Sequence, residues 1–180
     1  AGSGIPVSTS GIAFGGNPGV ATAEVWDGTN WTEVSDLNTA RMYLGGFGSA
    51  TSAIAGNGID PSASPPTYQQ NKVEKWNGSS WTEVSEMNTA RSEMLQGQGR
   101  TNESGIIAGG SPNGSSQITN TEIWNGSSWS ETNDLATARR MGGQIGPTSS
   151  GMYIGGQTPS NVVTVEHWDS PLANKTITAS

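Results

Sequence analysis

The sequence predicts an all-β propeller with four four-stranded blades. Two observations lead to this fold class. The 180-residue chain contains 26 glycines and only 13% charged residues, and Gly, Ser, Thr and Asn in place of charged residues favour short strands joined by tight turns over helices. A tryptophan-centred motif also returns at intervals of 50, 48 and 44 residues, close to the repeat length of roughly 40–50 residues of propeller blades.

The repeated motif opens at Trp26, Trp76, Trp124 and Trp168. In the first three copies it reads Trp-Asp/Asn-Gly-x-x-Trp, at 26–31, 76–81 and 124–129, and the fourth copy lacks the second tryptophan. A polar link that ends in Thr-Ala-Arg follows each complete copy, and its arginines are Arg41, Arg91 and Arg139. An apolar run closed by a glycine turn precedes each copy, at 11–16, 53–57, 105–110 and 151–156.

Each repeat is expected to form four strands. The first strand follows the arginine, the second is the apolar run, the third ends at the first tryptophan of the motif, and the fourth begins at the second tryptophan. Asn-Gly or Asp-Gly between the last two strands is a strong hairpin signal. The predicted blades span 1–36, 41–86, 91–134 and 139–180, within a single domain of residues 1–180.

Three arrangements of these blades fit the sequence. A closed four-bladed ring is within the known range of propellers, and it is the arrangement that we favour because an open end would expose apolar surface. The alternatives are half of an eight-bladed dimeric ring and an excerpt from a longer array.

The glycine-closed run, the aromatic residue at a hairpin, the second tryptophan and the arginine together resemble the Kelch repeat over essentially the whole chain. They also resemble the central propeller of galactose oxidase, and the Trp-Asn-Gly-x-x-Trp wording is similar to arrays in structural and tail proteins of marine bacteriophages. The resemblance implies a binding or assembly module on a virion or in another extracellular setting. Two departures are Gly56-Asn57 in place of a double glycine and the unrelated ending at 174–180.

A glutamate stands two residues before the first tryptophan in every copy, as Glu24, Glu74, Glu122 and Glu166. Carboxylates at one position of each blade could ring the axis and bind a cation. We favour the alternative in which each glutamate pairs with a repeated arginine and holds adjacent blades together. We likewise interpret the tryptophans as packing between blades and not as a sugar-stacking platform, so no metal site is predicted.

Composition excludes several classes of function. The net charge is −7 with only eight Lys plus Arg, which leaves no basic face for nucleic acid or for anionic membranes. The sequence has no run of eighteen apolar residues, so membrane insertion is not expected. Cysteine is absent, so disulfides, zinc-thiolate sites and the cysteine-linked tyrosine of the galactose oxidase copper site are all excluded. No cofactor is expected.

The residues that do not repeat are the better functional candidates, because loops on a rigid scaffold usually carry specificity. The connection between the second and third strands is longest in the second blade. In related propellers such connections share one face with the Thr-Ala-Arg links. We therefore predict a ligand site on this face, formed by Asp60, Tyr68, Gln69, Gln70, Asn113 and Gln117. The competing interpretation is a solvated insertion with no partner.

No catalytic residue is predicted. His167 is the single histidine, and no nucleophile-elbow sequence supports a Ser-His-Asp triad. We expect a non-enzymatic module that recognises a protein or a glycan, either as a homodimer or within a larger assembly. The alternatives are a lectin and a sialidase-like glycan hydrolase, whose arginine cluster would have to come from Arg41, Arg91, Arg100, Arg139 and Arg140.

Overall fold

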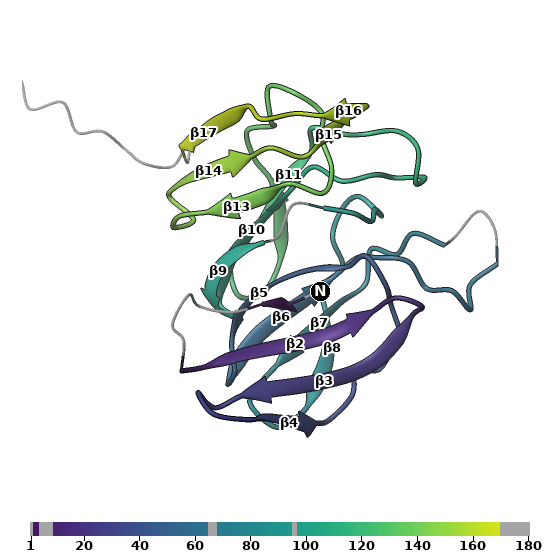
Figure 1. The fold of residues 1–180 in the computed structure, drawn as a ribbon, viewed down its shortest axis with the longest axis vertical. Helices are drawn as coiled ribbons and strands as arrows, with labels where there is room; N and C mark the ends of the chain where they lie inside the picture. The colour runs from purple at the N-terminus through teal and green to yellow at the C-terminus, as the bar shows by residue number, and fades with distance from the viewer. Residues whose placement is uncertain (1, 4–8, 65–67, 95–96, 170–180) are drawn as a thin grey trace, which may run out of the picture.

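A computed structural model describes residues 2–3, 9–64, 68–94 and 97–169 of the chain. These residues form strands, turns and loops without any helix. The strands make four small antiparallel sheets that follow one another along the chain (Figure 1). The described part contains no helix of the length and apolar character needed to cross a membrane.

The first two sheets each have four strands in sequence order. Sheet 1 contains β1 (Gly2–Ser3), β2 (Gly11–Gly16), β3 (Val20–Trp26) and β4 (Trp31–Val34). Sheet 2 contains β5 (Gly45–Ser49), β6 (Ser52–Gly56), β7 (Val73–Trp76) and β8 (Trp81–Val84).

The last two sheets continue the pattern. Sheet 3 contains β9 (Gln98–Thr101), β10 (Ser104–Ala108), β11 (Thr121–Trp124) and β12 (Trp129–Glu131). Sheet 4 contains β13 (Gly143–Ile145), β14 (Ser150–Ile154) and β17 (Val165–Asp169), and a separate small hairpin joins β15 (Gln157–Thr158) to β16 (Ser160–Asn161). The predicted last strand of the fourth repeat falls at 170–180, outside the described residues.

The predicted hairpins between the two tryptophans of the motif are present, with four residues between the paired tryptophans as the motif spacing requires. In sheet 2, the Asn77 side chain accepts hydrogen bonds from the backbone N–H groups of Ser79 (2.9 Å) and Ser80 (3.0 Å). Gly78 has a φ of +97°, which a glycine adopts without steric cost. The Asn-Gly pair therefore closes a side-chain-stabilised loop and not a two-residue turn.

Apolar contacts between consecutive sheets form the core. Opposite residues of an antiparallel pair point to the same face of a sheet, so every sheet has two distinct faces. Each sheet packs one of its faces on the next sheet along the chain, and that next sheet contributes the face of the opposite type. A leucine or methionine of the connecting link completes each cluster. The three clusters contain Ile12, Phe14, Leu37, Trp76 and Trp81 between sheets 1 and 2, Phe47, Ile54, Met87, Trp124 and Trp129 between sheets 2 and 3, and Ile106, Ala108, Leu135, Tyr153 and Trp168 between sheets 3 and 4.

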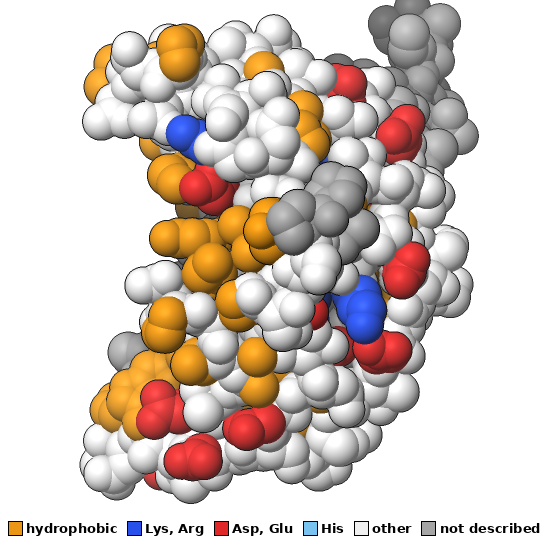
Figure 2. All heavy atoms as spheres, turned by 90° about the vertical axis from the view of Figure 1, so that its right-hand side faces the viewer, with side chains coloured by type: hydrophobic (Ala, Val, Ile, Leu, Met, Phe, Trp, Pro, Cys, Tyr) orange, Lys and Arg blue, Asp and Glu red, His pale blue; other side chains and the backbone are white. Residues whose placement is uncertain are grey.

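No other described sheet packs on either end of this stack. Among the described residues, no core cluster joins sheet 4 to sheet 1, so the closed four-bladed ring that we favoured on the sequence is not seen. Trp31 of sheet 1 is 51% exposed, whereas its equivalents Trp81 and Trp129 are 6% and 7% exposed. The sheets instead form an arc, which has a crescent outline in Figure 2.

The glycine pair of the second repeat lies one residue later than expected, at Asn57-Gly58, because the Gly58 N–H donates to the arginine carbonyl of the following link as the Gly16 N–H does. Asn57 thus replaces the first glycine of the pair without disturbing the backbone. It has a φ of +58°, a left-handed conformation that asparagine tolerates better than other residues with a side chain. The residue is fully buried, and its side-chain amide donates to the Thr89 carbonyl in the next link (3.0 Å). The substitution therefore ties one link to the preceding turn.

Candidate functional site

Buried arginine–glutamate pairs fix the links that border the candidate site. Arg41 lies 2.8 Å from Glu74, and both side chains are almost completely buried. Glu74 also accepts hydrogen bonds from the backbone of Asn38 (2.7 Å) and Thr39 (3.3 Å), so one carboxylate holds the middle of the link as well as its final arginine. Burial lowers the pKa of the Arg41 guanidinium, and the negative charge of Glu74 opposes that shift.

The same arrangement returns in the next two repeats. Arg91 lies 3.1 Å from Glu122, and Arg139 pairs with Glu166. Each of these three glutamates thus forms an ion pair with an arginine of the scaffold and is not free to bind a cation together with the others. Within the described ranges, no group of three or more acidic, histidine or cysteine residues could hold a metal ion. Glu24, the first member of the set, is exposed on sheet 1.

The first tryptophans of the motif also belong to the scaffold. Trp76, Trp124 and Trp168 are buried, and their indole N–H groups donate to backbone carbonyls at 2.9, 2.7 and 3.0 Å. Trp26 is partly buried and lies with its ring centre 5.6 Å from that of Trp31. The rings of Trp76, Trp124 and Trp168 are therefore not available to stack on a sugar.

Three residues with a left-handed backbone lie between a link and the first strand of the sheet that follows it. Tyr43, Glu93 and Met141 each follow the repeated arginine by two positions, and their φ values are +53°, +56° and +56°. A left-handed residue with a side chain costs roughly 1–3 kcal/mol, and such residues concentrate at functional sites. The Glu93 N–H donates to the Tyr43 carbonyl (2.9 Å), and the Met141 N–H donates to the Glu93 carbonyl (2.9 Å). The strained backbone is therefore one continuous row.

Arg140 connects this row to the neighbouring loop. Its guanidinium donates to the Glu93 carboxylate (2.6 Å), to the Gly114 carbonyl (2.6 Å) and, through Nε, to the Gln157 side chain (2.8 Å). The ion pair is mostly buried. Unlike the three scaffold arginines, Arg140 occurs in one repeat only, with Met42 and Ser92 at the equivalent positions.

The long connection of sheet 2 is ordered at its base. Ile59 forms isolated β-bridges to Met42 and to Gln69. The Asp60 carboxylate accepts from the Ser62 hydroxyl (2.6 Å) and backbone N–H (2.8 Å), and the hydroxyl bond is the largest contribution that lowers the pKa of Asp60. The Asp60 carboxylate therefore stabilises its own turn and is not a free anionic group.

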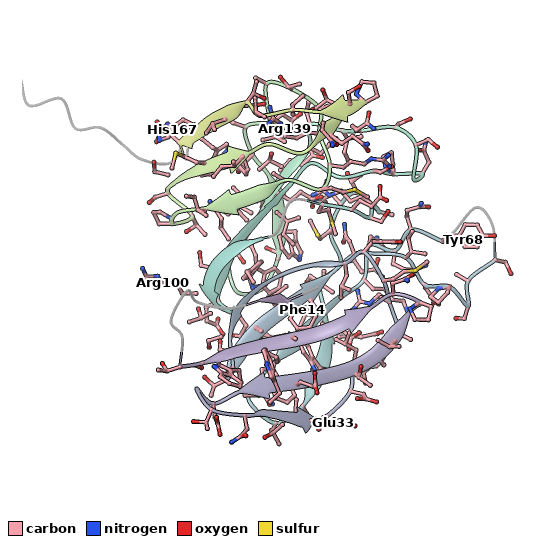
Figure 3. The ribbon with its side chains drawn as sticks, viewed as in Figure 1. Phe14, Glu33, Tyr68, Arg100, Arg139 and His167 are labelled. Atoms are coloured by element: carbon pink, nitrogen blue, oxygen red, sulfur yellow. The ribbon has the colours of Figure 1, made fainter. Side chains whose placement is uncertain are left out.

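The other predicted residues of this connection differ in how available they are. Tyr68 is 40% exposed, and Figure 3 shows it on the projecting connection at the right-hand side of the molecule. Gln69 and Gln70 are half-buried, and the Gln70 amide donates to the Tyr68 carbonyl (3.4 Å). The connection thus presents a tyrosine on a braced loop.

The connection of sheet 3 carries the remaining two predicted residues. The exposed Asn113 side chain accepts from the backbone N–H groups of Ser115 and Ser116 at 2.9 and 2.8 Å, and the Gln117 amide donates to the Ser115 carbonyl (3.2 Å). Both side chains are engaged in shaping their own turn. The link at 91–93 lies between the two connections, because Arg91 accepts from the Gly58 N–H and residue 92 bridges residue 111.

The predicted residues therefore share a face with a row that the sequence reasoning did not identify. Both connections project to the right in Figure 1, and Figure 2 views that side, where hydrophobic side chains follow the concave margin and most of the remaining surface is neutral. We define the loop face as Tyr43, Tyr68, Glu93, Arg140 and Met141 together with the two connections. The sequence signal for the row was one variable position, occupied by Tyr, Glu or Met, two residues after an invariant arginine of the repeat.

The arginines of the alternative hydrolase prediction are held apart in separate contacts: Arg41, Arg91 and Arg139 are buried in scaffold ion pairs, Arg140 pairs with Glu93, and Arg100 lies on the side opposite to Tyr68 (Figure 3). A Ser-His-Asp contact is present elsewhere, on sheet 4. The Ser150 hydroxyl lies 3.1 Å from His167 Nε2, and His167 Nδ1 lies 3.5 Å from Asp169. However, the His167 and Asp169 side chains are 60% and 70% exposed, and Figure 3 shows His167 and Arg100 on the side opposite to Tyr68. Water at this exposed triad weakens the electrostatic stabilisation that a triad needs.

Comparisons with known proteins give information on the fold alone. No family model and no curated protein matches the sequence. A solved structure, that of YjhT, matches 81% of this chain with a TM-score of 0.64 at 16% sequence identity. The match covers 48% of the YjhT chain, so this chain spans about half the length of that protein.

Proposed function

We propose that the chain is a non-enzymatic recognition module whose loop face binds a protein or a glycan. The observation that carries the proposal is the row of three left-handed residues, at which a repeated and strained backbone position bears three different side chains. Residues that serve only the scaffold are the same in each repeat, as Arg41, Arg91 and Arg139 are. Variation at a strained position therefore favours recognition.

The chemistry of the loop face suits such a ligand. Tyr43 and Tyr68 are 44% and 40% exposed, and tyrosine offers both an apolar ring and a hydroxyl for hydrogen bonding. The Glu93–Arg140 pair holds its position through several hydrogen bonds, so binding would not have to order it. Because the charges on this pair neutralise each other, a neutral glycan or a peptide fits this face better than an ion.

We further propose that the four sheets are Kelch-type propeller blades of the kind that the Trp-Asn-Gly-x-x-Trp motif resembles. The succession of small antiparallel sheets and the similarity to YjhT support this proposal at the level of the fold. A setting on a phage particle or another extracellular structure follows from the sequence resemblance. A lectin is the specific form of this function that the exposed tyrosines favour.

The proposal is tested with a glycan microarray and a peptide display library, both probed with the full chain. We expect a reproducible binder whose affinity falls at least tenfold, which is about 1.4 kcal/mol, in a Tyr43→Ala, Tyr68→Ala double variant. Arg100→Ala is the matched control, because Arg100 is exposed on the opposite side. Binding that survives the double variant, or that is lost in the control, would contradict the assignment of the face.

A second variant tests the long connection of sheet 2 separately. Replacement of residues 60–70 by a short Gly-Ser link removes Tyr68 and its braced loop but leaves the row at Tyr43, Glu93 and Met141. If the connection contributes to recognition, binding weakens while the thermal unfolding midpoint changes little. Unchanged binding would show that the connection is a solvated insertion and that the row alone recognises the ligand.

A further inference from the structure

The outer faces of sheets 1 and 4 expose positions whose described equivalents are buried between sheets. On sheet 4, residues Ile145, Met152, Ile154 and Val165 point to one face, as their pairing in the sheet requires, and are all exposed. On sheet 1, the opposite type of face exposes Trp31. The outer face of sheet 4 is therefore of the type that packs on the outer face of sheet 1, but the two faces lie at opposite ends of the arc.

The internal junctions show what these positions contact when they are covered. Phe14 of sheet 1 packs edge-on against Trp81 of sheet 2, with ring centres 5.2 Å apart. Phe47 of sheet 2 lies over Gly105 of sheet 3, where a Cβ atom would stand 2.1 Å from the ring. A side chain from one sheet thus fills the space that a glycine leaves on the next.

The strand pairing identifies the equivalent residues on the two outer faces. Ile154 occupies the position of Phe14, because each lies one residue beyond the partner of the repeated glutamate. Ile145 occupies the position of Phe47. On sheet 1, Trp31 is the equivalent of Trp81, and Gly11 is the equivalent of Gly105, with open space above it.

We propose that two copies of this chain close into one ring of eight sheets, with sheet 4 of each copy packed on sheet 1 of the other. Ile154 then contacts Trp31 of the second copy, and Ile145 lies over Gly11 of the second copy. The crescent outline in Figure 2 leaves its concave side open toward such a partner. This assembly is independent of the loop face, because it uses the outer faces of the end sheets.

The size of the junctions favours a closed ring over an open chain of copies. The described face of sheet 4 is three strands wide and about five residues long, so it measures about 14 by 17 Å, since strands lie about 4.8 Å apart and rise about 3.3 Å per residue. One junction therefore buries about 500 Å² in total, which is well below the range of roughly 1,200–2,000 Å² for stable interfaces. Two equivalent junctions, related by a two-fold axis, together bury about 1,000 Å² and come close to the lower end of that range.

Light scattering on the full chain gives the first test. We expect a mass about twice the 18.6 kDa of one chain at micromolar concentration. Ile154→Glu places a charge in both junctions, so this variant should have the mass of one chain with an unchanged circular dichroism spectrum. Val163→Glu is the matched control, because Val163 is 95% exposed and lies in the connection that precedes β17, and it should remain dimeric.

Cross-linking tests which faces meet. The chain has no cysteine, so single cysteines at Thr9 and His167 can be joined selectively by a short bismaleimide. These positions correspond to Glu103 and Lys75, whose side chains meet at 2.7 Å across the junction of sheets 2 and 3. We expect a covalent dimer from a mixture of Thr9→Cys and His167→Cys chains, and none from either variant alone.

Several results would overturn the proposal. They are a mass of one chain at tens of micromolar, a mass that grows beyond two chains with concentration, a dimer that survives Ile154→Glu, and cross-linking of either single variant with itself. The first would show that something other than a second copy covers these faces. The last would show that like faces meet.

Discussion

The replacement Glu74→Gln tests the buried ion pair and the hydrogen bonds that hold the link between sheets 1 and 2 in place. Glu74 is fully buried, pairs with Arg41 at 2.8 Å and accepts from the backbone N–H of Asn38 at 2.7 Å. Glutamine has nearly the same shape, so no cavity forms. Its amide has a single acceptor oxygen, however, and either Arg41 or Asn38 must then face an NH₂ group that cannot accept its hydrogen bond. The guanidinium also stays buried without a counter-charge.

The size of the effect follows from that loss. Removal of one partner from a buried ion pair costs about 3–5 kcal/mol, because the remaining charge is left uncompensated. Proteins of 150–250 residues lose about 2–4 °C of melting temperature per kcal/mol, so we expect Glu74→Gln to melt about 6–20 °C lower. Glu24→Gln, made in the Ile154→Glu background so that the outer face of sheet 1 stays uncovered, is the matched control at the same position of the first repeat. Since Glu24 is exposed in the single chain, it should change the stability by less than about 0.5 kcal/mol.

Urea unfolding followed by tryptophan fluorescence measures both variants. The midpoint concentration should fall strongly for Glu74→Gln and stay constant for Glu24→Gln, with the slope unchanged in both. Equal stabilities of the two variants would refute the reasoning, because they would show that burial of the pair contributes nothing beyond an exposed carboxylate.

Three further predictions concern single residues. Gly105→Ala should cost about 1–3 kcal/mol of unfolding free energy by overpacking, since its Cβ would stand 2.1 Å from an aromatic ring, whereas Gly143→Ala, with its nearest neighbour at 3.9 Å, should cost less than about 1 kcal/mol; thermal denaturation compares them. In an NMR titration, Ser62→Ala should raise the lowered pKa of Asp60 toward its ordinary 3.8, and the stabilisation from this contact is present above that pH and lost as the pH falls through the lowered value. Ser150→Ala should leave the hydrolysis of p-nitrophenyl acetate at the wild-type rate, and a drop would reveal a working triad.

The repeat in the sequence was enough to predict most of the strands. The spacing of the motif placed a hairpin between Trp76 and Trp81, and these two residues are directly opposite in the sheet. The turn residues act locally, so the sequence alone carries their effect. The spacing of the motif also predicted four residues between the strands, but not the side-chain bonds of Asn77 that close the turn, because these depend on which backbone groups the side chain reaches.

The candidate site was predicted in part. The sequence indicated the loop face through Tyr68, which is exposed there, but Asp60 and Asn113 shape their own turns. The row at Tyr43, Glu93 and Met141 was missed, because left-handed backbone in residues other than glycine leaves no reliable mark in a sequence.

The amino-acid sequence by itself determined the all-β character, the strand periodicity and the repeated residues, because these depend on turn chemistry and on the two-residue alternation of strands. Only the tertiary structure decided which copies of a repeated residue are buried. Glu24 and Glu74, or Trp31 and Trp81, are equivalent in sequence, yet only one of each pair is covered. The physical reason is that burial of a sheet face requires a neighbouring sheet, and the end of the arc provides none.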